Sequence, residues 1–166
     1  METMEKNTIY TALNTAKSYE EYRNLVNELF AKGKSTGYIQ TEAYLNYTSL
    51  NIHRMNKWDK HYKVGTEAHK QLQKLTEKEI WLVISEGWCG DAAHAMPVIK
   101  KLADSSQIVE MKIVLRDENP ELMDMFLTNG ARSIPKLIRL SENGEVLGTW
   151  GPRPALGQKI IDDAKA

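Results

Sequence analysis

The feature that most constrains the fold is a continuous apolar run, IWLVIS, at residues 80–85. A short run without polar alternation is typical of a strand that is buried on both faces. Such a strand lies inside a sheet that has other elements packed on each side. The run leads into SEGWCGDAAH (85–94), which contains Cys89, the only cysteine in the chain. The sequence therefore predicts a buried strand that ends next to a single thiol.

The residues that follow predict a helix, a strand and a second helix. Apolar residues recur at helical spacing after Cys89, and Pro97 among them predicts a kink or a missing hydrogen bond. IVEMKIVL (108–115) alternates as a half-buried strand does. Asn119, as N-cap before a proline, begins a further helix that Gly130 ends.

The C-terminal part predicts a β-hairpin. PKLIRLSENGEVLGTW (135–150) divides into two strands at Asn143-Gly144, a strong hairpin signal. A last helix is expected from about Ala155, and its pattern is still running at Ala166. A parallel first half followed by an antiparallel hairpin predicts an α/β fold with a mixed sheet and flanking helices.

The N-terminal part is predicted to be helical. Ser18 and Glu21 form a capping box at the start of a helix that Gly33 ends. A longer helix is expected over residues 41–62, and Thr66 is expected to cap a third. Many tyrosines lie in these helices, which predicts that they pack on the sheet; a partner or dimer surface is the alternative.

The composition excludes several classes of function. Lys plus Arg and Asp plus Glu each total 22, so no net field draws the chain to nucleic acid or to an anionic membrane. Neither a signal-peptide core nor a stretch of about 20 apolar residues is present. A single cysteine rules out an internal disulfide and a cysteine-rich metal site, and no other metal-ligand set stands out. A cytoplasmic location is expected, and the oligomeric state stays open.

Three motifs together resemble the thioredoxin superfamily. WCGDA (88–92) resembles the Trp-Cys-Gly-Pro-Cys turn, SIP (133–135) the cis-proline segment, and NGEVLGTWG (143–151) the final strand with its groove-lining glycine. The resemblance implies a thioredoxin-like domain at residues 80–166. Residues 1–79 then form an N-terminal helical extension, as in some bacterial thioredoxin-family proteins.

Two residues depart from the family pattern. Ala92 stands where the second, resolving cysteine is expected, and Val83 stands where many thioredoxins bury an aspartate. The family uses that aspartate to help deprotonate the second cysteine, so the two losses are consistent with each other.

The position of Cys89 bears on its reactivity. At a helix N-cap, free backbone N–H groups and the helix dipole favour the thiolate, whereas the nearby Asp91 carboxylate opposes a second negative charge. The sequence thus predicts a thiol pKa below the ordinary value, depressed less than a neutral residue at 91 would allow. His94 would act as a base for this thiol or, more commonly, lie on the surface.

The predicted function is monothiol thiol-disulfide exchange at Cys89. Without a resolving cysteine, an external low-molecular-weight thiol such as glutathione must clear each mixed disulfide, and no bound cofactor is expected. Protein or small-molecule disulfides are the expected substrates, and Arg153 would meet a carboxylate of a thiol ligand. The alternative is a redox-inactive module that binds polypeptides or thiol ligands in the same groove. The resemblance places substrate binding at Trp88, Gly90, Asp91, Ile134, Pro135, Trp150 and Gly151.

Overall fold

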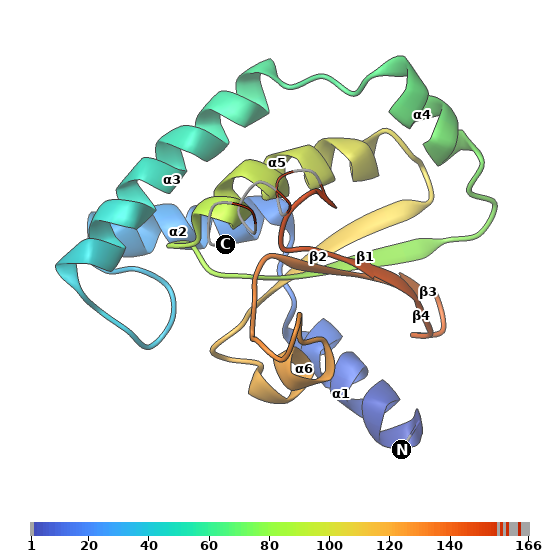
Figure 1. The fold of residues 1–166 in the computed structure, drawn as a ribbon, viewed down its shortest axis with the longest axis horizontal. Helices are drawn as coiled ribbons and strands as arrows, with labels where there is room; N and C mark the ends of the chain where they lie inside the picture. The colour runs from blue at the N-terminus through green and yellow to red at the C-terminus, as the bar shows by residue number, and fades with distance from the viewer. Residues whose placement is uncertain (1, 156, 158, 160–162, 164–166) are drawn as a thin grey trace.

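The computed structural model describes residues 2–155 together with residues 157, 159 and 163. Its centre is a four-stranded sheet in the order β2-β1-β3-β4 (Figure 1). The strands are β1 (Glu79–Ser85), β2 (Val109–Leu115), β3 (Lys136–Ser141) and β4 (Val146–Trp150). β1 pairs parallel with β2 and antiparallel with β3, and β3 pairs antiparallel with β4. The predicted α/β fold with a mixed sheet is confirmed.

Helices cover both faces of the sheet (Figure 1). They are α1 (Glu2–Thr15), α2 (Tyr19–Ala31), α3 (Glu42–His61), α4 (Thr66–Gln73), α5 (Gly90–Asp104) and α6 (Pro120–Met125). α2, α3 and α5 lie on one face, whereas α1 and α6 lie on the other. The capping box of Ser18 and Glu21 is present at the start of α2, and the Thr41 side chain caps α3.

Alternate residues of β1 enter two separate cores. Val83 packs with Tyr22 of α2, Met55 of α3 and Met96 of α5. Leu82 and Ile84 point to the other face, where they join the cluster that includes α1 and α6. β1 is therefore buried on both faces, as its apolar run predicted.

The N-terminal helices pack on the sheet, and one residue between them pairs with its outer strand, β2. Lys17, between α1 and α2, forms an isolated antiparallel bridge with Ile113 of β2, with both N–O distances 2.8 Å. Residues from either side of position 79 share both cores. The division of the chain at that position stays a prediction.

Some element boundaries differ from the prediction. α1 was not predicted, because only Ile9 and Ala12 on it are buried and the apolar pattern is sparse. The N-cap of α4 is Gly65, with no side-chain hydrogen bond, and Thr66 is already helical. α6 ends at Met125 rather than near Gly130, which instead has a φ of 78° in the turn after the helix. The expected helix from Ala155 falls mostly outside the described residues.

In the described part of the chain, no helix combines the length and the apolar character that a membrane crossing requires.

Candidate functional site

Cys89 forms the N-cap of α5. The chain leaves β1 at Ser85, turns through four residues, of which Cys89 is the last, and begins the helix at Gly90. Cys89 keeps an extended backbone, with φ −81° and ψ 117°, and its Sγ accepts a hydrogen bond from the Ala92 N–H at 3.4 Å. The half-buried sulfur thus satisfies one of the free N–H groups of the first helical turn, as the motif predicted.

The segment before β3 comes directly against this sulfur. The Ile134–Pro135 peptide bond is cis, and both residues are buried. The Cys89 thiol donates to the Ile134 carbonyl oxygen, with an S–O distance of 3.4 Å. Two segments 45 residues apart in sequence therefore bring the Cys89 sulfur into contact with the backbone of Ile134.

The ionisation of Cys89 differs from the prediction. Burial raises the pKa of the thiol, the Ala92 N–H lowers it in part, and the Asp91 carboxylate raises it again. The net pKa lies above the ordinary cysteine value, so the predicted depression is wrong. Loss of water around the sulfur outweighs the hydrogen bonds at the helix N-terminus.

Asp91 and Arg153 pair with each other at the start of α5. Arg153 Nη2 lies 2.9 Å from Asp91 Oδ2, and both side chains are about one-third exposed. Asp91 raises the pKa of the thiol, as predicted, and as an acidic residue in the first turn it also stabilises the helix N-terminus. Arg153 is engaged with this carboxylate.

Trp88 lies between two side chains from distant elements. Its ring stacks on Tyr44 of α3, with centroids 4.7 Å apart, and the Arg116 guanidinium lies over it at 5.0 Å. Trp88 packs against the α1/α6 core and Trp150 against the opposite core, while Cys89 contacts both cores. A substrate-binding role for the two indoles stays a prediction.

Gly151 lies directly on the backbone of Pro135. A Cβ at Gly151 would lie 2.2 Å from the Pro135 carbonyl oxygen, and the φ of Gly151 is 124°. Neither the space nor this backbone conformation suits an L side chain. The glycine thus allows the end of β4 to close against the Ile134–Pro135 segment.

Replacing Gly151 with alanine is expected to lower the free energy of unfolding by about 3 kcal/mol, because the clash is with backbone and the φ is strained. Gly148→Ala, three residues earlier in β4, is the matched control, since the nearest atom to its Cβ position is 3.8 Å away. Urea unfolding of both variants measures the difference. Equal stability of the two variants would contradict the close packing of Gly151 on Pro135.

Glu86 is a buried carboxyl group that the sequence analysis did not identify. Its side chain is 0% exposed and its Oε1 has no hydrogen-bond partner. Burial, and then the nearby Asp117 carboxylate, raise its pKa to about 8. Its backbone carbonyl accepts from the Cys89 N–H at 3.1 Å, so this acid lies in the same turn as Cys89. The sequence signal was a charged residue directly after the run IWLVIS.

The loop between α2 and α3 closes over this carboxyl. The Cβ position of Gly37 lies 3.1 Å from Glu86 Oε1, 2.6 Å from Asp117 Oδ2 and 3.3 Å from Trp88 Nε1. Thr36 Oγ1 donates to Glu86 Oε2 at 3.4 Å and accepts from the Gly87 N–H at 2.8 Å. The loop therefore covers the acid and leaves no room for a side chain at position 37.

Two other positions considered from the sequence lie apart from the thiol chemistry. Val83 is fully buried in the apolar core, so the carboxyl near this turn is Glu86 rather than a residue of β1. His94 is exposed, and its Nδ1 accepts from Trp58 Nε1 at 3.0 Å. Burial and the positive charge of Arg54 lower the pKa of His94.

Among the described residues, no group of three or more His, Cys, Asp or Glu side chains is arranged to hold a metal ion.

Comparison with known proteins identifies the family. No curated protein matches the sequence. A protein of unknown function from Pseudomonas aeruginosa has a similar structure, with a TM-score of 0.59 and 17% identity over 90% of this chain and 87% of that one. An HIV epitope scaffold gives a TM-score of 0.57 and 18% identity over 88% and 82%. These identities show a shared fold alone. The sequence matches the thioredoxin family over residues 37–165, from the loop before α3 and through both Cys89 and Pro135, and the chain therefore belongs to the thioredoxin superfamily.

Proposed function

We propose that this thioredoxin-like protein performs monothiol thiol-disulfide exchange at Cys89, with an external thiol as the resolving partner. The observation that carries the proposal is the placement of the Cys89 sulfur 3.4 Å from the Ile134 carbonyl oxygen. A disulfide in an extended substrate segment would pair with this backbone and present its sulfur to Cys89. When the substrate arrives, its donors would replace the thiol at that carbonyl.

The exchange proceeds in two balanced steps. The Cys89 thiol loses its proton to solvent, and the thiolate attacks one sulfur of a disulfide, which breaks the substrate S–S bond and releases the other half as a thiolate. An external thiolate such as glutathione then attacks the substrate sulfur of the mixed disulfide, which leaves as a new disulfide with that thiol, and the Cys89 thiolate is regenerated. Since Ala92 occupies the place of a resolving cysteine, the second step needs this outside thiol. A cytoplasmic location belongs to the same proposal, because thiols are kept reduced there.

The test uses glutathione disulfide and intact mass. Wild-type protein is expected to gain one glutathione per chain, whereas Cys89→Ser gains none. The rate is expected to keep rising with pH beyond about 8.5, the ordinary cysteine pKa, because the thiol pKa is raised and only the thiolate attacks. No adduct at any pH would exclude exchange.

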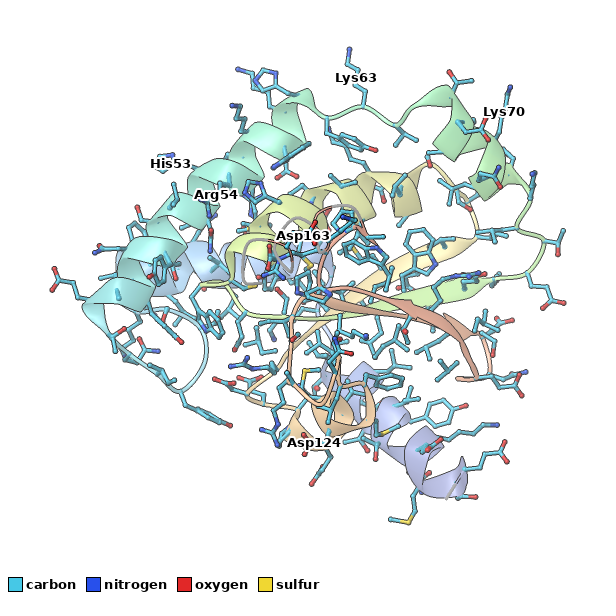
Figure 2. The ribbon with its side chains drawn as sticks, viewed as in Figure 1. His53, Arg54, Lys63, Lys70, Asp124 and Asp163 are labelled. Carbon is cyan, nitrogen blue, oxygen red and sulfur yellow. The ribbon has the colours of Figure 1, made fainter. Side chains whose placement is uncertain are left out.

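A charge variant checks the cause of that pH dependence. Asp91→Asn is expected to speed adduct formation at pH 7.5 by about threefold, since it removes a carboxylate that raises the thiol pKa. Asp124→Asn is the matched control, because Asp124 also pairs with an arginine but lies on α6 (Figure 2). Equal acceleration by both variants would show that net charge, not Asp91, is responsible.

The second candidate is a redox-inactive module that binds polypeptides in the same groove. The raised pKa of Cys89 favours it, because most of the thiol is protonated near neutral pH. In this case the Ile134 backbone would bind an extended peptide without any covalent step. Peptide binding that is unchanged by Cys89→Ser, with no glutathione adduct on the wild type, would support this candidate.

A further inference from the structure

A cavity beside the active-site turn is built largely by the N-terminal helix α3. Its volume is about 390 Å³, and it is lined by Tyr44, Tyr47, Leu50, Asn51 and Arg54 of α3 together with Trp88 and Gly90. Trp88 and Gly90 are the two neighbours of Cys89 in the chain. The volume is within the range of small-molecule sites, about 300–1,000 Å³. The cavity therefore lies against the turn that carries Cys89.

Arg54 is held over Gly90 by a buried amide. Asn51 is 1% exposed, and its Nδ2 donates to the Gly87 carbonyl oxygen at 3.0 Å, which ties α3 to the active-site turn. Its Oδ1 accepts from Arg54 Nη1 at 3.1 Å. The same Nη1 lies 3.1 Å from the Cβ position of Gly90, so a larger residue there would displace the guanidinium. Figure 2 shows Arg54 on the side of α3 turned toward α5, with His53 on the outer side.

The charge of Arg54 is not balanced by a carboxylate. In the described part of the chain, no Asp or Glu lies within ion-pair distance of it, and the Asn51 amide is its hydrogen-bond partner. The adjoining cavity, of about 520 Å³, shares Arg54 in its lining and also includes Lys57 and Lys63, which add positive charge beside Arg54. A guanidinium with unused donors beside aromatic walls suits a planar anion such as a carboxylate.

We infer that this cavity is a subsite for a small, carboxylate-bearing thiol or disulfide, with Arg54 binding its carboxylate and Asn51 positioning Arg54. Trp88 and the α3 tyrosines supply apolar walls for the rest of such a ligand. This inference rests on the proposed exchange at Cys89 and names its substrate class. It also gives α3 a function, because this helix supplies a cation, Arg54, beside Gly90 of the turn that carries Cys89.

The first test compares two alkylating reagents on Cys89, which need no exchange chemistry. The ratio of the iodoacetate rate to the iodoacetamide rate is expected to fall about fivefold in Arg54→Gln, because only iodoacetate carries a carboxylate. A change in the thiol pKa alters both rates by the same factor, because both reagents react with the same thiolate, and it therefore cancels in the ratio. The rate ratio of Arg54→Lys, which keeps the charge, is expected to lie between those of the wild type and Arg54→Gln. Lys60→Gln, on the exposed side of α3, is the charge-matched control. An equal ratio in Arg54→Gln and Lys60→Gln would overturn the subsite.

The second test compares glutathione disulfide, an anion, with cystamine, a cation, in mixed-disulfide formation. Arg54→Gln is expected to lower the glutathione-to-cystamine rate ratio by at least the same factor. A lowered alkylation ratio with an unchanged disulfide ratio would overturn the ligand class. If Cys89 is alkylated but forms no mixed disulfide with either reagent, the proposed exchange fails, while the alkylation ratio still decides the role of Arg54.

Discussion

Glu86→Gln is expected to stabilise the protein by about 3 kcal/mol at pH 7.5 and by less than about 1 kcal/mol at pH 5. The wild-type carboxyl is 0% exposed and has a pKa of about 8 in the folded chain. In the unfolded chain it ionises near its ordinary value of 4.5. Folding at neutral pH must therefore protonate this group, which glutamine does not require.

The sign of the pH dependence follows from the raised pKa of Glu86. A group that binds its proton more tightly when folded gives its full stability below the unfolded pKa, and this stability is lost as the pH rises to the folded pKa. The loss therefore falls between about pH 4.5 and pH 8. Above that range the Glu86 carboxylate would lie beside Asp117 and Glu118, against the single opposing charge of Arg116.

The measurement is urea unfolding of both proteins across this pH range. Glu79→Gln is an informative control, since it also removes one negative charge from a buried carboxyl, yet Glu79 binds Arg139 through both oxygens. That variant is expected to be less stable than the wild type, because it leaves Arg139 without its carboxylate. A Glu86→Gln protein that is no more stable at pH 7.5 than the wild type would contradict the burial of an uncompensated acid.

Ala92→Cys is expected to change the fate of the mixed disulfide completely. The Ala92 N–H already lies 3.4 Å from the Cys89 sulfur, on the first turn of α5. A thiol on this residue would attack the Cys89–glutathione disulfide from within the chain, release one glutathione thiol and leave a disulfide between Cys89 and the introduced cysteine. Intramolecular attack is favoured by several orders of magnitude over attack by a dilute external thiol.

The expected time courses differ accordingly. The wild-type adduct persists when free thiol is removed, whereas the Ala92→Cys adduct disappears within minutes and the protein mass falls by one glutathione. Ala93→Cys is the matched control, because Ala93 is equally buried on the next position of the helix and does not contact the sulfur through its N–H. Persistence of the adduct in Ala92→Cys would mean that position 92 does not face the mixed disulfide.

Local signals explain the parts of the fold that the sequence predicted well. The apolar run of β1, the capping box at Ser18 and the spacing along α3 each depend on residues within one element. Cys89 as an N-cap is local in the same sense. The weakly apolar α1 was missed, because its burial comes from packing against α6 and β2 rather than from its own pattern.

The properties of the site that were missed depend on distant segments. Glu86 is buried by the loop at residues 35–40 and by Asp117, and neither is near it in sequence. The sulfur of Cys89 is covered by the Ile134 segment, which reverses the expected direction of its pKa shift. No local sequence signal marks Arg54, and only the packing of α3 against the turn brings it over Gly90.

The central claim is that Cys89 forms a mixed disulfide that only an outside thiol can release. The direct measurement is the intact mass of wild-type protein, first incubated with glutathione disulfide at pH 8.5, then freed of small molecules, and finally given glutathione. We expect one glutathione per chain at Cys89, a stable adduct after desalting, and full recovery of the original mass once glutathione is added. A protein that takes up no glutathione, or one that loses it without added thiol, would contradict the claim.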